Sequence, residues 1–86
     1  MNSATGKQWV VYIVECSDHT LYTGITNNLQ KRINTHNKGK GARYTKTRLP
    51  IILLWHTIVP DKSSALKLEY KIKQLSRADK LTLVNP

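Results

Sequence analysis

The chain is 86 residues long, 40% hydrophobic and 22% charged, and its 14 Lys and Arg outnumber its 5 Asp and Glu, which gives a formal charge of +9 at pH 7. The length excludes two domains, since each would need its own core, and the composition excludes a disordered chain. The positive excess favours a polyanionic partner such as nucleic acid, whereas a single cysteine, Cys16, excludes an internal disulfide and a cysteine-based metal site.

The N-terminal stretch is polar, and we expect a flexible segment over residues 1–8 before one domain over residues 9–84. The apolar run that follows is too short for a signal peptide or a membrane span, so we expect a cytoplasmic protein without membrane contact. Residues 9–16 are rich in β-branched and aromatic side chains and predict a strand. Turn residues follow, and residues 21–25 predict a second strand that pairs with the first as an antiparallel hairpin.

A helix and a basic loop are predicted after the hairpin. Asn27 and Gln30 resemble a capping box, and the helix that they open is expected to run to about Asn37, before Gly39. The loop over residues 38–48 carries five positive charges and no negative one. These charges, which we expect to contact nucleic acid, belong to Lys38, Lys40, Arg43, Lys46 and Arg48.

The C-terminal half predicts one strand and two helices. Residues 51–59 are apolar almost throughout and predict a strand that is covered on both faces. Asp61 is the expected N-cap of a helix that ends near residue 75. The positions of this helix expected in the core are Ala65, Leu68, Ile72 and Leu75. Ser76 and Asp79 predict a cap for a short last helix.

Tyr12 and Tyr22 lie on the two arms of the predicted hairpin, on either side of a turn centred near Ser17, and are expected to be close across the strands. The plain interpretation is a pair of core aromatics with hydrogen-bonded hydroxyls. A phenol can act as a general base only if positive charge or a metal-bound water lowers its pKa. Arg32 and the basic loop would supply such a field.

Arg32 and His36 are spaced so that they project from one side of the predicted helix. Arginine suits the extra negative charge of a phosphoryl-transfer transition state, and histidine can contact phosphate, orient water or transfer a proton. The structural alternatives are a solvated arginine and a helix-end histidine favoured by the helix dipole. Gly24, in the second strand, either permits a close approach of the backbone to nucleic acid or relieves a twisted strand.

Glu69 lies in mid-helix beside the apolar stripe, whereas Asp18, Asp61 and Asp79 stand at turn and cap positions. Its structural alternative is an ion pair with Lys73, one helical turn further on. Its functional interpretation is a ligand for Mg²⁺ or Mn²⁺, because Mg²⁺ takes few protein ligands and fills its other positions with water and phosphate oxygens.

Taken in order, these residues resemble the GIY-YIG nuclease superfamily, most closely its small single-domain bacterial (UPF0213-like) proteins. The first tripeptide is Val11-Tyr12-Ile13, a degenerate form, and the second is Tyr22-Thr23-Gly24. Residues 28–36 are similar to the arginine helix of the family, including its Arg-x-x-x-His pattern. Residues 39–45 and 65–69 resemble the small subfamily, and the resemblance extends from residue 9 to residue 83.

The resemblance implies an α+β fold in which a small three-stranded antiparallel sheet is flanked by helices, with one divalent metal, Mg²⁺ or Mn²⁺, on Glu69. In similar nucleases the tyrosine matching Tyr12 is a favoured general base, and the tyrosine matching Tyr22 supports the hydrogen-bond network. The arginine matching Arg32 stabilises the transition state. Tyr12, Tyr22 and His36 all remain candidates for the residue that takes the proton.

We therefore expect a metal-dependent endonuclease that hydrolyses DNA in repair or recombination, with RNA as the other nucleic acid to consider. Because phosphate contacts position a protein without reading sequence, cleavage is expected to be structure-selective or nonspecific. The main alternative is a nucleic-acid-binding module with weak or no catalysis, which the degenerate first tripeptide favours. A protein-interaction adaptor is the third, and it predicts that neutralising Arg43, Lys46 and Arg48 barely affects nucleic-acid binding. The sequence indicates no oligomeric state.

Overall fold

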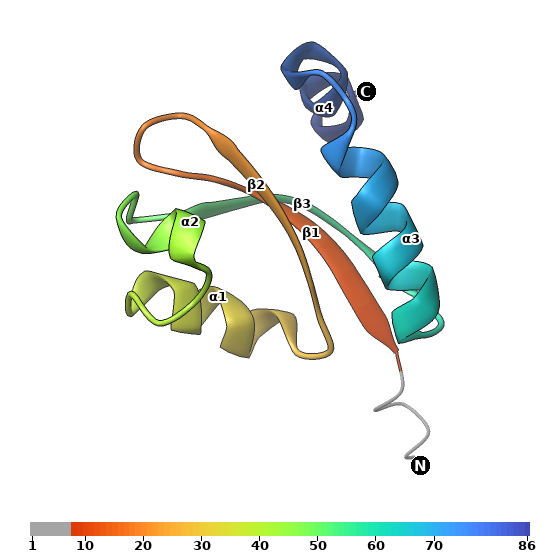
Figure 1. Ribbon diagram of the computed structural model, residues 1–86, viewed down its shortest axis with the longest axis horizontal. Helices are drawn as coiled ribbons and strands as arrows, with labels where there is room; N and C mark the ends of the chain where they lie inside the picture. Colours follow the sequence, from red (N-terminus) through yellow and green to blue (C-terminus); the bar gives the residue numbers. More distant parts are fainter. Residues whose placement is uncertain (1–7) are drawn as a thin grey trace.

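The computed structural model describes residues 8–86, so the segment expected to be flexible, residues 1–8, lies outside the described residues except for its last member. The elements in the described part are β1 (Trp9–Glu15), β2 (Leu21–Thr26), α1 (Leu29–Asn37), α2 (Arg43–Lys46), β3 (Ile52–Val59), α3 (Lys62–Lys73) and α4 (Arg77–Val84) (Figure 1). The strands form one antiparallel sheet, as predicted for this α+β fold, and the structure shows their order to be β2-β1-β3. No helix within residues 8–86 is long and apolar enough to cross a membrane.

The central strand β1 carries the most buried part of the sheet. Val11, Tyr12, Ile13 and Val14 are all 0% exposed. Because successive side chains of a strand point to opposite faces, Val11 and Ile13 pack in the cluster that includes α3, whereas Tyr12 and Val14 pack in the cluster that includes α1. Figure 1 shows α1 and α2 on one side of the sheet and α3 on the other. The sheet is thus the middle layer of three.

The edge strand β3 is less covered than predicted. Ile52 is 61% exposed and Ile58 is 58% exposed, so the expectation that both faces are covered is wrong. Trp55 and Val59 do pack against the core. The helices cover the centre of the sheet, and the apolar side chains near the two ends of this edge strand therefore reach solvent.

The start of α1 lies one residue later than the predicted capping box. Asn28, not Asn27, is the N-cap, and its side chain accepts a hydrogen bond of 3.2 Å from the backbone amide of Lys31. Gln30 does not reach back to the cap; its side-chain amide donates to Asn34 at 3.2 Å. The amide of Asn28 is instead satisfied by a side-chain hydroxyl at the end of β2, at 3.0 Å.

The caps of the two C-terminal helices are confirmed. Asp61 and Ser76 each accept a hydrogen bond from the backbone amide three residues further on, at 2.7 and 3.1 Å. Leu75 lies beyond the end of α3 and is 37% exposed, so its predicted place in the core is wrong. The helix stops before it could turn this side chain inward. The other three predicted core positions pack as expected: Ala65, Leu68 and Ile72.

Candidate active site

The β1–β2 hairpin places Tyr12 and Tyr22 on the same face of the sheet. Tyr12 pairs with Gly24 and Tyr22 with Val14, so the two tyrosines are diagonal neighbours and not directly opposite each other. Gly24 has no side chain where the Tyr12 ring passes, and a Cβ there would lie inside van der Waals contact of the phenol. The Tyr12 side chain therefore extends across β2, toward the edge of the sheet.

Helix α1 brings His36 to this pair of tyrosines. The Tyr12 hydroxyl lies 2.8 Å from Nε2 of His36, and both side chains are 0% exposed. The Tyr22 ring stands edge-on to the imidazole, with 5.6 Å between the ring centroids. Three of the five residues predicted to be catalytic thus form one contact group.

His36 is neutral at physiological pH. Burial, and to a smaller extent the positive charge of Arg32, lower its pKa from the ordinary value of 6.5 to about 4. His36 does lie in the last turn of α1, as the structural alternative expects, but a buried neutral ring does not fit a charged histidine held by the helix dipole. The Nδ1 atom of the same ring lies 2.8 Å from the hydroxyl of Thr45, a buried residue of α2 that the sequence marked only as the last of the stretch similar to the small subfamily and to which it gave no role.

Tyr12 carries its proton at neutral pH. Burial raises the pKa of its hydroxyl, and the charges of Tyr22 and Glu69 raise it too, whereas Arg32 acts in the opposite direction and is outweighed. Arg32 is therefore close enough to act on both Tyr12 and His36. A phenolate that acts as a free base would need a lowered pKa, whereas the pKa of Tyr12 is raised.

Glu69 forms the ion pair that the sequence offered as its structural alternative. Its Oε2 lies 3.3 Å from Nζ of Lys73, but the Glu69 side chain is only 20% exposed, against 51% for Lys73. The same ammonium lies 5.9 Å from the centre of the Tyr22 ring. Together with the effect of Glu69 on the pKa of Tyr12, this places the ion pair at the border of the tyrosine site.

The donor set around Glu69 fits a metal ion with one protein ligand. Within the described residues, no group of three or more His, Cys, Asp or Glu side chains could hold a metal ion. Mg²⁺ is commonly bound through one or two carboxylates, with water and substrate phosphate oxygens in its other positions. A single half-buried carboxylate is sufficient for that mode of binding.

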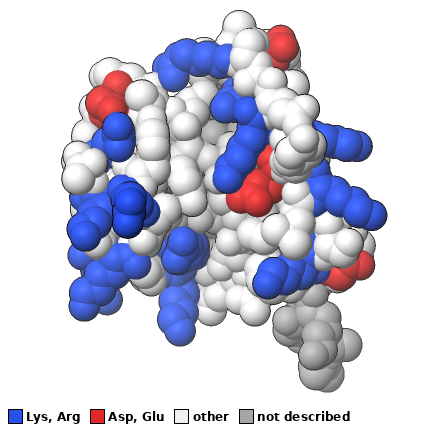
Figure 2. Space-filling model, in the orientation of Figure 1, with Lys and Arg blue, Asp and Glu red and all other residues white. Residues whose placement is uncertain are grey.

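A pocket of about 270 Å³ lies beside Tyr22 and is lined by residues of β2, α2, α3 and α4. Its lining residues are Leu21, Tyr22, Thr23, Tyr44, Lys73 and Lys80. The Tyr44 ring stacks on Tyr22, with 6.0 Å between centroids. Figure 2 shows Lys and Arg side chains along both sides of a pale furrow on this face, with few acidic residues. The furrow presents positive charge to an incoming polyanion.

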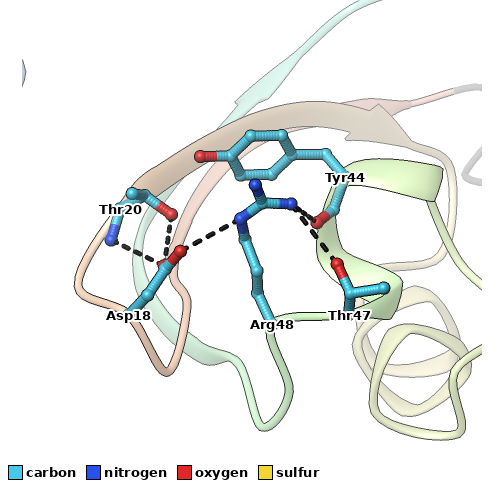
Figure 3. A network of polar contacts seen from close by, with 5 residues as sticks. All are labelled: Asp18, Thr20, Tyr44, Thr47 and Arg48. Atoms are coloured by element: carbon cyan, nitrogen blue, oxygen red, sulfur yellow. Dashed lines mark hydrogen bonds and ion pairs between the residues drawn. The ribbon is translucent and has the colours of Figure 1, made fainter.

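Arg48 differs from the other cations predicted to contact nucleic acid. Its Nε donates to Asp18 at 3.0 Å and its guanidinium lies 4.0 Å from the centre of the Tyr44 ring (Figure 3). A further hydrogen bond of 2.8 Å runs to the backbone oxygen of Tyr44. Arg48 thus ties the hairpin turn to α2. The remaining basic side chains of this segment make no ion pair within residues 8–86: Lys38, Lys40, Arg43 and Lys46.

The geometry has counterparts among known proteins. The family model of the GIY-YIG catalytic domain matches residues 8–82. A UPF0213 protein of Staphylococcus haemolyticus is 53% identical over 74 residues, which cover 86% of this chain and 90% of that protein. A UPF0213 protein of Desulfotalea psychrophila is 56% identical over 77 residues, covering 88% and 70%. The solution NMR structure of a UPF0213 protein from Bacillus halodurans has 44% sequence identity and a TM-score of 0.58, covering 90% of this chain and 82% of that one.

Proposed function

Because the chain belongs to the GIY-YIG family of catalytic domains, a nuclease family, we propose that it is a metal-dependent endonuclease that hydrolyses phosphodiester bonds in DNA. The observation that carries this proposal is the buried hydrogen bond of 2.8 Å between the Tyr12 hydroxyl and neutral His36. It offers a proton acceptor inside a chain of formal charge +9, next to the cation of Arg32.

The proton route runs through Tyr12 to His36. The attacking water gives a proton to the Tyr12 oxygen as its own oxygen bonds to phosphorus and the bond from phosphorus to the 3′ oxygen breaks. Tyr12 passes its original proton to Nε2 of His36, and the leaving 3′ oxygen takes up a proton from water. No phenolate accumulates, which agrees with the raised pKa of Tyr12. Charging a buried His36 is costly, and the negative charge that gathers on the phosphoryl group in the transition state offsets that cost.

Arg32 and Glu69 act on the phosphoryl group, Arg32 directly and Glu69 through a divalent ion. The Arg32 guanidinium hydrogen bonds to the non-bridging oxygens, whose negative charge is largest in the transition state. Glu69 would hold a divalent ion, Mg²⁺ or Mn²⁺, which when bound polarises the phosphate and stabilises the leaving 3′ oxygen. Lys73 would then release the carboxylate and be free to contact a neighbouring phosphate.

The contact with DNA comes from two groups of basic side chains. Within residues 8–86, the ones that lie between α1 and the end of α2 make no ion pair, and two lysines line the pocket beside Tyr22. Contacts of this kind reach phosphate and sugar, so they fix position without reading base sequence. We propose structure-selective or nonspecific cleavage in repair or recombination.

The test is cleavage of labelled DNA by the purified chain. Duplex, branched and single-stranded DNA are incubated with Mg²⁺ or Mn²⁺, and the expected result is metal-dependent cutting. Glu69→Gln, Arg32→Ala and Tyr12→Phe should each reduce the rate by about 100-fold or more. Glu15→Gln is the matched control, because this carboxylate lies at the end of β1 and contacts His19. If both Glu69→Gln and Tyr12→Phe still cleaved DNA at the wild-type rate, the proposal would be wrong.

A second candidate is a nucleic-acid-binding module with little catalysis. Two observations favour it, namely the existing ion pair of Glu69 with Lys73 and the protonated state of Tyr12. It predicts salt-sensitive binding of DNA or RNA without metal-dependent nicking. Binding and cleavage measured on the same protein preparation separate the two candidates.

A further inference from the structure

Thr45 occupies a buried position between the backbone of α2 and the imidazole of His36. It is 0% exposed, and its hydroxyl lies 3.0 Å from the carbonyl oxygen of Ala42 and 2.8 Å from Nδ1 of His36. With the contact from Nε2 to Tyr12, these bonds form one continuous chain from Tyr12 to Ala42. We infer that Thr45 is a positioning residue, which fixes the tautomer of His36 so that Nε2 is free to accept the proton of Tyr12.

The single proton of the Thr45 hydroxyl determines which group donates and which accepts in this series of hydrogen bonds. A carbonyl oxygen can only accept, so the hydroxyl donates to Ala42 and its own lone pair faces His36. Turning that proton toward His36 would leave two acceptor oxygens 3.0 Å apart with nothing between them. The Nδ1 atom of His36 therefore carries the hydrogen of the second bond.

The state of Nε2 follows from the charge of the ring. A neutral imidazole has one N–H, and His36, with a pKa of about 4, is neutral at pH 7. With its hydrogen on Nδ1, the ring has a bare Nε2, which accepts from the Tyr12 hydroxyl at 2.8 Å. In the opposite tautomer Nε2 would donate to Tyr12, and the phenol would have no acceptor for its proton. This role rests on the proposed function, in which His36 receives that proton.

The position of the ring does not depend on Thr45 alone. Gly41 packs directly on His36, and a Cβ at Gly41 would lie inside van der Waals contact of both Nδ1 and the His36 backbone. Tyr22 covers another side of the ring. Replacing the Thr45 hydroxyl by a methyl group of similar size should therefore leave the imidazole in place and change only its proton.

The experiment records side-chain ¹⁵N signals of His36 by NMR at pH 7, in the full chain. The protonated and bare nitrogens of a neutral imidazole have well-separated signals, so the tautomer is read directly. We expect the Nδ1–H form in the wild type and in Thr45→Ser, and a shift toward the Nε2–H form in Thr45→Val. Thr82→Val is the matched control, because this exposed hydroxyl on α4 also donates to a backbone carbonyl, far along the chain from His36.

Two results would overturn the assignment. One is a wild-type spectrum with the proton on Nε2, which needs no variant to fold, and the other is a Thr45→Val spectrum identical to that of the wild type. Cleavage rates provide a separate readout, in which Thr45→Val lowers kcat by about 10–100-fold at unchanged KM and Thr45→Ser restores it. If the tautomer responds as expected but the wild type cuts no DNA, the nuclease proposal fails, and what stands is that Thr45 fixes the tautomer of His36.

Discussion

Tyr12 lies directly opposite Gly24 in the antiparallel pair of β1 and β2, and its ring occupies the space that a side chain at position 24 would fill. The atoms that a Cβ at this position would meet first are the hydroxyl and the ring carbon that bears it, the end of Tyr12 that contacts His36. Gly24 thus has a structural role in the site that is independent of any contact with DNA.

Gly24→Ala is expected to displace the Tyr12 hydroxyl and break its hydrogen bond to His36. Forcing a methyl group into this packed region should lower the free energy of unfolding by about 1–3 kcal/mol. Urea denaturation followed by circular dichroism measures the loss. Any cleavage activity should fall as well, because the proton acceptor is no longer aligned with Tyr12.

A double-mutant cycle with Tyr12→Leu isolates this contact. Without the phenol ring, the added methyl at position 24 meets no aromatic atoms, so Gly24→Ala should cost much less in the Tyr12→Leu background. If Gly24→Ala lowered the free energy of unfolding equally in both backgrounds, glycine would be needed at position 24 for its backbone and not to leave space for the Tyr12 ring.

Much of the fold was predictable because the signals are local. The hairpin follows from two β-rich stretches around turn residues, and the caps at Asp61 and Ser76 follow from residue types at fixed spacing. The diagonal placement of the tyrosines follows from the register of that hairpin. His36 was predictable as a residue on the arginine side of α1, whereas its complete burial depends on packing against other segments.

The features of the fold and of the site that the sequence did not predict depend on contacts between segments far apart in the chain. An apolar strand has the same composition at the edge of a sheet as at its centre, so the exposure of Ile52 and Ile58 was not visible in the sequence. Thr45 was marked only as the end of the stretch over residues 39–45, because the role of a threonine in a short basic segment becomes visible only when α2 packs on His36. Arg48 could not be told from its basic neighbours until Asp18 was placed beside it.

The stability of the protein should fall between pH 6.5 and pH 4 because of His36. The folded-state pKa is about 4, whereas the ordinary value is 6.5, so in this window the unfolded chain binds a proton that the folded protein does not. The contribution is fully present above pH 6.5 and is lost as the pH falls toward 4. It amounts to on the order of 3 kcal/mol at most, and denaturation curves at intervals of pH measure it.

His36→Gln should remove this part of the pH dependence, whatever it does to stability at pH 7. His56→Gln is the matched control, because His56 is exposed on β3 and should leave the dependence as it is in the wild type. A wild-type stability that stays flat from pH 6.5 to pH 4 would mean that His36 takes up a proton without cost, and the neutral ring in the proton route would be wrong.

Lys46 and Arg48 should differ in what their loss affects. Lys46 is exposed and makes no ion pair within residues 8–86, so Lys46→Ala should weaken DNA binding and reduce the slope of log K against log salt by about 0.9 for duplex DNA. Arg48→Ala should change that slope less, because its charge is already shared with Asp18. It should instead lower Tm by a few degrees, since the hairpin turn loses its tie to α2.

Fluorescence anisotropy titrations at several salt concentrations, with melting curves of the same samples, test both statements. Equal salt slopes for the two variants would show that Arg48 leaves Asp18 when DNA binds. If neither variant changed the slope, α2 would not be part of the DNA contact, and an adaptor that binds protein would gain support.

Lys73 should compete with a divalent ion for Glu69, since both bind the same carboxylate. In Lys73→Met the ammonium that lies 3.3 Å from Oε2 is lost while the apolar stem is kept, so Mn²⁺ affinity should rise by about two-fold or more, the value of one helical ion pair. Lys71→Met, an exposed lysine on the same helix, is the matched control for the change in net charge. Glu69→Gln should abolish the binding both alone and combined with Lys73→Met, and Mn²⁺ titration followed by electron paramagnetic resonance measures the affinity of the wild type and of each variant. An affinity that is the same in Lys73→Met and Lys71→Met, or that survives Glu69→Gln, would place the ion elsewhere and leave Glu69 with a structural ion pair alone.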